Sequence, residues 1–180
     1  GGIISLDKVP NSDYSAVSNL AAGTFNMTGG LITMSDGIGV VNGGKFVLDG
    51  GTITNCRNSR TNTSYGVGVY VYSNGNFIMK SGTISNNTGP SSGFSHGGGV
   101  AVLGGAIFTM EGGLIDGNVS GQGISSGGGV FVEYSTFIMT GGTISGNKCR
   151  GDTGNYSSGS GGGVHISAAT FTMKGGTISG

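Results

Sequence analysis

One pattern, F-x-M-x-G-G-x-I, returns six times along the chain at nearly fixed spacing. Leucine replaces the methionine once, and serine replaces the first glycine once. A self-similar period of roughly 20 to 50 residues indicates a repeat architecture, in which each short unit stacks on the next. The copies begin at Phe25, Phe46, Phe77, Phe108, Phe137 and Phe171.

Each repeat reads as three short strands. In the unit at residues 97–118, three stretches alternate apolar with small or polar residues, and glycines separate them. Such alternation is typical of strands with one buried face, and no segment of useful length has the period of a helix. Three strands per turn, stacked in register, predict an all-β parallel β-helix of about six coils.

The spacing between copies places extra residues at one corner of the solenoid. The first two copies are 21 residues apart, and the later ones are 29 to 34 apart. Insertions at one corner project from one side, where binding sites often lie. We therefore expect a fringe of Ser/Gly-rich loops along one edge. The excess falls at residues 57–65, 88–96, 119–126 and 148–160.

Residues 1–180 read as a single β-helix repeat segment. The first five residues, G-G-I-I-S, match G-G-T-I-S at 175–179, so both ends fall at the same point of the repeat. Because solenoids normally end in atypical capping repeats, we expect the segment to belong to a longer array. Uncapped, neutral ends would also permit coaxial self-association into a filament.

Stacking in register predicts columns of like side chains. The Phe, Met and Ile positions would each form an internal ladder, and burying one such side chain is worth roughly 1.5–3 kcal/mol. A corner column of stacked amides is expected as well. Outside, Asp49, Lys80 and Glu111 alternate in sign from coil to coil, so we expect them to attract one another. The corner column contains Cys56, Asn87, Asn118 and Asn147.

Composition excludes two classes of partner. Glycine is 42 of 180 residues, which alone would suggest a low-complexity chain. However, 35% of the residues are hydrophobic and recur at fixed positions relative to the glycines, which indicates a folded core. Only 9% of residues are charged and the formal net charge is zero, so there is no electrostatic footprint for nucleic acid. No apolar run approaches the ~20 residues that membrane insertion needs.

The pattern G-G-G-V-x-V … F-x-M-x-G-G-T-I-S-G-N resembles the right-handed parallel β-helix repeats of bacterial surface and secreted proteins of the adhesin-like type. It is more distantly similar to the G-G-x-I repeats of polymorphic outer-membrane proteins, which carry F-x-x-N where this chain has F-x-M. The resemblance covers nearly the whole chain and implies a right-handed coil. It also implies an extracellular or cell-surface location and a structural, adhesive or fibre-forming role.

Four residues form the candidate binding site. Tyr70, Phe131 and His165 occupy one outward column of the first strand, and Tyr72 lies two residues beyond Tyr70. Exposed aromatic rings suit sugar rings or a protein partner, and an exposed apolar patch often marks an interaction site. Scattered surface aromatics are also common in proteins without such a role.

An enzyme is the first alternative, because polysaccharide lyases and glycoside hydrolases also use this fold. Glycoside hydrolysis needs two carboxylates about 5–10 Å apart, whereas the acidic residues here are mostly isolated. Glu133 and His165, on adjacent coils, come nearest to an acid–base pair. Two His and two Cys at unrelated positions make no metal-ligand set. We therefore assign no catalytic residue, metal or cofactor.

Ice binding is the second alternative. The third strands carry T-x-T-like pairs that resemble the threonine ladders of antifreeze proteins, although Leu114 and Asp116 interrupt them. Threonine and serine also simply favour outward strand positions. The pairs are Thr52/Thr54, Thr83/Ser85, Thr143/Ser145 and Thr177/Ser179.

The corner insertions contain more basic than acidic residues. Such a fringe could attract an anionic glycan, but the coils between the basic residues lack charge. The residues are Arg57, Arg60, His96, Lys148 and Arg150, with Asp152 as the only acid.

Together these features predict a non-enzymatic structural and adhesive segment of an extracellular or cell-surface protein. Its outward residues repeat at a fixed spacing, so weak sites could engage a repetitive glycan or host-surface protein many times at once, by avidity.

Overall fold

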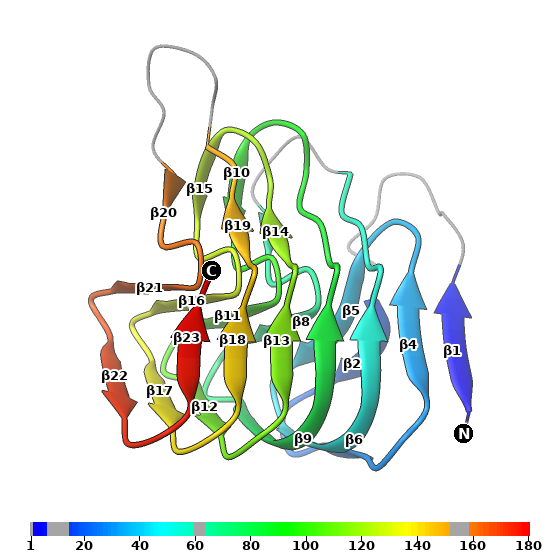
Figure 1. The fold of residues 1–180 in the computed structure, drawn as a ribbon. Helices are drawn as coiled ribbons and strands as arrows, with labels where there is room; N and C mark the ends of the chain where they lie inside the picture. The colour runs from blue at the N-terminus through cyan, green and yellow to red at the C-terminus, as the bar shows by residue number, and fades with distance from the viewer. Residues whose placement is uncertain (1, 7–14, 60–63, 152–158) are drawn as a thin grey trace.

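The computed structural model describes residues 2–6, 15–59, 64–151 and 159–180. The chain is an all-β parallel solenoid with no helix in these ranges, so the predicted fold is confirmed, with about five turns where the sequence predicts about six coils. Figure 1 shows successive coils side by side, from the N-terminal strand to the C-terminal one.

The first strands of the coils pair in parallel into a six-stranded sheet, here the first-strand sheet. Its members, in spatial order, are β2 (Ser15–Asn19), β5 (Ile38–Asn42), β8 (Val69–Val71), β11 (Val100–Leu103), β16 (Val130–Glu133) and β21 (Val164–Ser167).

The second and third strands form an eleven-stranded sheet that bends at the Gly-Gly of the repeat. Two strands run through the bend, β6 (Lys45–Thr54) and β9 (Asn76–Ser85). The second strands are β3 (Thr24–Met27), β12 (Ile107–Met110), β17 (Thr136–Met139) and β22 (Thr170–Met173). The third strands are β1 (Ile3–Leu6), β4 (Leu31–Met34), β13 (Leu114–Asp116), β18 (Thr143–Ser145) and β23 (Thr177–Ser179).

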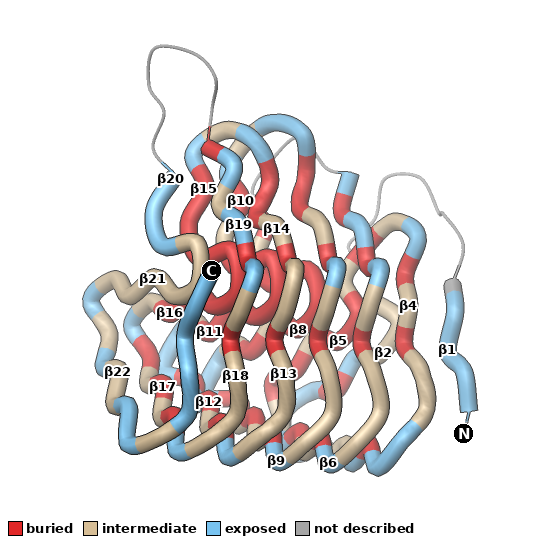
Figure 2. Tube along the Cα trace, viewed as in Figure 1, coloured by how far each residue is buried: buried red, intermediate tan, exposed pale blue. Residues whose placement is uncertain are grey.

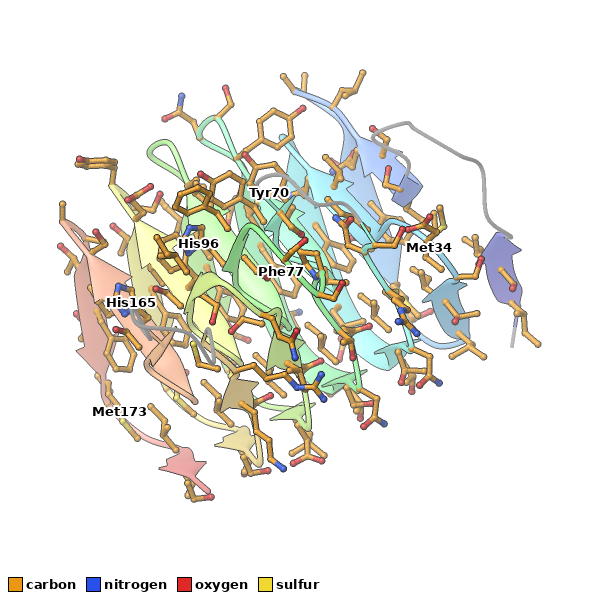
Figure 3. The ribbon with its side chains drawn as sticks, turned by 90° about the horizontal axis from the view of Figure 1, so that it is seen from above. Met34, Tyr70, Phe77, His96, His165 and Met173 are labelled. Carbon is orange, nitrogen blue, oxygen red and sulfur yellow. The ribbon has the colours of Figure 1, made fainter. Side chains whose placement is uncertain are left out.

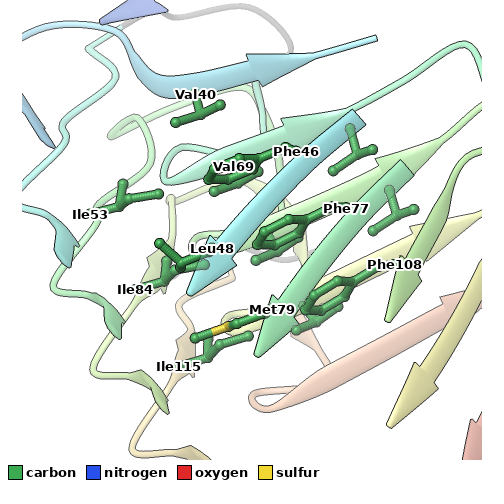
Figure 4. Packing of buried hydrophobic residues seen from close by; sticks show 14 of the residues in the cluster. Val40, Phe46, Leu48, Ile53, Val69, Phe77, Met79, Ile84, Phe108 and Ile115 are labelled. Atoms are coloured by element: carbon green, nitrogen blue, oxygen red, sulfur yellow. The ribbon is translucent and has the colours of Figure 1, made fainter. Parts of the chain in front are cut away.

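The interior consists of the predicted ladders, whose side chains lie above one another in Figure 4. Figure 2 shows that buried positions recur from coil to coil. Each motif phenylalanine stacks on the next, with ring centroids 4.7 to 4.9 Å apart and planes 3 to 12° from parallel. Leu48 pairs with Met79, and Ile53 pairs with Ile84, so the Met and Ile columns are in register too. The motif repeats because each position must match its copy one coil away.

A buried amide column closes the corner after the third strand, as predicted. The Asn87 side chain donates to Asn118 Oδ1 at 2.8 Å, and the Asn118 side chain donates to Asn147 Oδ1 at 3.0 Å. Each amide also donates to the isoleucine carbonyl of the preceding coil. Cys56 occupies the same column, and its backbone N–H donates to Asn87 Oδ1.

A glycine is required opposite each of these amides. A Cβ at Gly99 would lie 2.6 Å from the carbonyl oxygen of Gly129 and 3.0 Å from both Asn118 Nδ2 and an Ile115 methyl carbon. A carbonyl oxygen of the next coil and the side-chain amide of the column crowd Gly68 and Gly129 in the same way. The glycine-rich start of the first strand therefore lets neighbouring coils and the amide column approach closely.

Of the expected charge alternation along Asp49, Lys80 and Glu111, the first step is wrong, whereas Lys80 and Glu111 keep the register of the strands on either side of them. The pairing of β6 with β9 shifts after Leu48, so that Asp49 lies opposite Ser81 and accepts a hydrogen bond from its hydroxyl at 3.2 Å. Lys80 is the extra residue at this irregularity, and none of the three charges forms an ion pair with another in the described ranges. Beyond the bend, Thr52 and Thr83 are back in register.

The described parts of the corner insertions are not a plain fringe of loops, because they stack on one another as well. They form a four-stranded parallel sheet, and β14 (Val119–Ser120) pairs with β19 (Lys148–Cys149) beside it. Ser64, Ser95 and Ser125 form a buried column in this insertion sheet, and Ser95 and Ser125 accept backbone N–H groups. The four strands are β7 (Ser64–Tyr65), β10 (Phe94–His96), β15 (Ile124–Ser126) and β20 (Gly159–Ser160).

Candidate functional site

Six rings form one continuous row along the outside of the solenoid, here called the aromatic row. Neighbouring centroids are 4.6 to 5.8 Å apart, and the planes are 13 to 27° from parallel. Figure 3 shows Tyr70, His96 and His165 following one another along the ribbon. In order, the row is Tyr72, Tyr70, Tyr65, His96, Phe131 and His165.

The predicted column supplies three of these rings. Ala101 pairs with Tyr70 on one side and with Phe131 on the other, and Phe131 pairs with His165. The column therefore lacks a ring at Ala101. Tyr65 and His96 bridge this coil, because Tyr65 stacks on Tyr70 and His96 stacks on Phe131.

Two sheets meet at an inside corner along this row. Tyr65 and His96 belong to the insertion sheet, whereas Tyr70 and Phe131 belong to the first-strand sheet. Side chains from the two sheets contact one another, so both sheets turn these faces toward the same corner. Figure 1 shows the sharp turn of the chain from β20, in the insertion sheet, to β21, in the first-strand sheet, which forms this corner.

The inner rings of the row are stacked on both sides, so their faces are covered and only their edges can reach solvent. Phe131 is only 3% exposed, because His96 and His165 stack on its two sides. The expectation that Phe131 offers an open platform is therefore corrected. Tyr70, Tyr72 and His165 are half-buried and keep some exposed surface. A ligand at this corner would meet ring edges and tyrosine hydroxyls.

Burial keeps the centre of the row uncharged at neutral pH. It raises the pKa of Tyr70, and the neighbouring tyrosines raise it further. It also raises the pKa of Tyr65, with a smaller contribution from the Glu133 carboxylate. Burial lowers the pKa of His96; Glu133 partly offsets this, and His165 adds to it. Tyr65 and Tyr70 therefore keep their hydroxyl protons, and His96 is neutral.

The structure does not pair Glu133 with His165. Glu133 lies opposite Leu103 and Ser167, whereas His165 lies opposite Phe131 and stacks on it. The two are thus diagonal neighbours, and no ion pair joins them within the described ranges. In that part of the chain, no three His, Cys, Asp or Glu side chains gather closely enough to hold a metal ion.

The hydroxyl columns of the third strands are in register but not continuous. Thr52 pairs with Thr83 and Thr143 pairs with Thr177, with Leu114 between the two pairs. In the second column the Ser145 hydroxyl donates to the Asp116 carboxylate at 2.6 Å. Both of these interruptions lie in the middle of the solenoid.

The basic corner residues are dispersed. Arg57 and Lys148 share a column and are exposed, but Thr88 and Val119 separate them. Arg60 and Asp152 lie outside the described residues.

Sequence reasoning missed Tyr65 and His96 as members of the site, together with two exposed apolar residues beside them, Phe94 and Ile124. One signal could have found the first two. Both residues directly precede a glycine that opens a Gly-rich strand, so they occupy equivalent positions in successive coils. Residues at equivalent positions of successive coils stack on one another. Phe94, two residues before His96, would then lie on the same face of its strand as His96.

Within the described ranges, no helix has the length and apolar character needed to cross a bilayer. Comparison of the chain with models of protein families, with curated proteins and with solved structures finds no match. The fold and the aromatic row are therefore the features on which a function can be argued.

Proposed function

We propose that this chain is a non-enzymatic structural and adhesive segment of an extracellular or cell-surface protein. Its outward side chains would bind a repetitive ligand, a glycan or a surface protein, through many weak contacts. One observation carries the proposal: a continuous row of six stacked rings follows the rigid solenoid over four successive coils.

Rigidity supports this role. The Phe ladder and the buried amide column fix the coils against one another, and parallel hydrogen bonds link every pair of neighbouring first strands. A surface held this way loses little conformational entropy when it binds. Its outward groups keep their spacing, which a repetitive ligand can match.

The proposal is tested by measuring whether linking several copies of the segment strengthens its binding. The segment, biotinylated at one end, is measured as a monomer and as a streptavidin-bound tetramer on films of neutral polysaccharide, acidic polysaccharide and fibrous protein. Tetramerisation should strengthen retention by roughly 10²–10⁴-fold on at least one film. Equal retention of the two forms on every film, or none at all, would contradict the proposal. Sedimentation of the monomer sample checks that coaxial self-association does not imitate multivalency.

A further inference from the structure

Within that adhesive role, we propose that the inside corner binds a neutral, linear polysaccharide that lies parallel to the solenoid axis. The inference rests on the proposed adhesive function and adds the site and the class of ligand. It involves binding alone, with no bond made or broken.

The corner has an extended shape. The first-strand sheet contributes rings from Tyr70 in β8 to His165 in β21, which are three coil steps apart. At ~4.8 Å per step, the row is about 14 Å long. A chain-like ligand parallel to the axis would contact rings from all four coils, whereas a ligand across the axis would meet the rings of one coil.

The insertion sheet forms one side of the inside corner and carries exposed apolar side chains there. Phe94 and Ile124 are cross-strand partners in the insertion sheet, and they are 47% and 45% exposed. Phe94 lies two residues before His96, on the same face of β10. Because His96 contacts Phe131, that face is turned toward the corner. Phe94 and Ile124 therefore continue the apolar surface of the aromatic row onto the insertion sheet.

The groups of the corner match the two kinds of surface on a sugar. Apolar C–H patches of sugar rings suit Phe94, Ile124 and the ring edges, and sugar hydroxyls suit the hydroxyls of Tyr70 and Tyr72. Sites that combine aromatic side chains with a few polar groups are typical of small-molecule recognition.

Charge selects a neutral ligand. Glu133 lies two residues after Phe131, on the same face of β16, which places its carboxylate at the corner. Its charge acts on both Tyr65 and His96. An acidic polysaccharide would bring further negative charge toward it, and the nearest groups of the row supply no compensating cation at neutral pH. A peptide strand is also disfavoured, because the strands of both sheets pair their backbone groups with the neighbouring coils.

Affinity electrophoresis in native gels tests the site with real polymers. The gels contain mixed-linkage β-glucan, galactomannan or soluble starch as neutral polysaccharides, and polygalacturonate or hyaluronan as acidic ones. The variants are Ile124→Ser and Phe94→Ser. Ile107→Ser is the matched control, since Ile107 is 42% exposed on β12, away from the corner. Thermal unfolding by circular dichroism confirms that each variant is folded.

We expect at least one neutral polysaccharide to retard the chain. Ile124→Ser and Phe94→Ser should each weaken that retardation about tenfold, while Ile107→Ser leaves it unchanged. Equal retardation of all three variants, or retardation by acidic polymers alone, would overturn the inference. Binding to a protein film without any retardation by a polysaccharide would overturn it as well, but would leave the adhesive function standing.

Discussion

The imidazole of His96 completes the aromatic row at the coil where the outward column has Ala101. It stacks on Phe131 with centroids 4.6 Å apart, while Tyr65 links it back to Tyr70. A residue of the insertion sheet thus replaces a ring that the first-strand sheet lacks. This contact holds the insertion against the solenoid and forms the inside corner.

Removing this ring should loosen the insertion sheet. His96→Ala loses two stacked contacts, each worth about 0.5–1.5 kcal/mol beyond area burial, whereas His96→Phe keeps them. The measurement is limited proteolysis with mass analysis of the cut sites. Cleavage of His96→Ala should be faster in residues 88–96 than cleavage of His96→Phe. Equal cleavage of the two variants would mean that the ring does not hold the insertion.

The same residue predicts a pH dependence. Burial lowers the pKa of His96 below its ordinary 6.5, so the unfolded chain binds a proton at higher pH than the folded chain. The free energy of unfolding should therefore fall as the pH drops below about 6.5. Urea titrations at about pH 7.5 and about pH 5 compare wild type with His96→Phe. Wild type should lose more stability than the variant, and an equal loss would contradict the assignment.

The glycine column predicts a position-specific cost. Gly99→Ala introduces a Cβ within 2.6 Å of a carbonyl oxygen of the next coil, with neighbouring coils on both sides. Overpacking of this kind typically costs about 1–3 kcal/mol. Gly29→Ala is the control, because its Cβ would meet nothing within 4 Å. Chemical denaturation should separate the two variants; similar midpoints would show that the coils are less closely packed.

A reciprocal exchange tests the amide column. Cys56→Asn places an amide beside Asn87 and should be neutral or stabilise by about 0.5–1.5 kcal/mol. It also removes a buried thiol, whose pKa burial raises to about 12. Asn118→Cys removes an amide that donates to Ile84 and Asn147, leaving buried groups unpaired. In thermal unfolding, Cys56→Asn should have a higher melting temperature than Asn118→Cys. A higher melting temperature for Asn118→Cys would contradict the amide column.

The repeat made the interior predictable, because a stacked position must match its neighbour. The Phe ladder and the Asn87–Asn118 contact follow from spacing alone. The register shift beside Lys80 could not be predicted. It depends on the backbone path of β6 and β9 through the bend, where one strand has an extra residue before Asp49 and the other has one after it.

The candidate site was only partly predictable for a similar reason. The column of Tyr70 and Phe131 follows from the period of the strands. The insertion strands have only two or three residues each, too few for alternation to be read, so the contributions of Tyr65 and His96 depend on the angle between two sheets. That angle also explains why Phe131 is buried and not open.

Retention and cleavage of one neutral polysaccharide, followed together, test the central claim most directly. The chain is incubated with mixed-linkage β-glucan, bound protein is measured by co-sedimentation, and new chain ends are counted. Retention that Ile124→Ser weakens, with no new chain ends, is the predicted result. New chain ends that Glu133→Gln abolishes would contradict it and make the inside corner the active site of an enzyme.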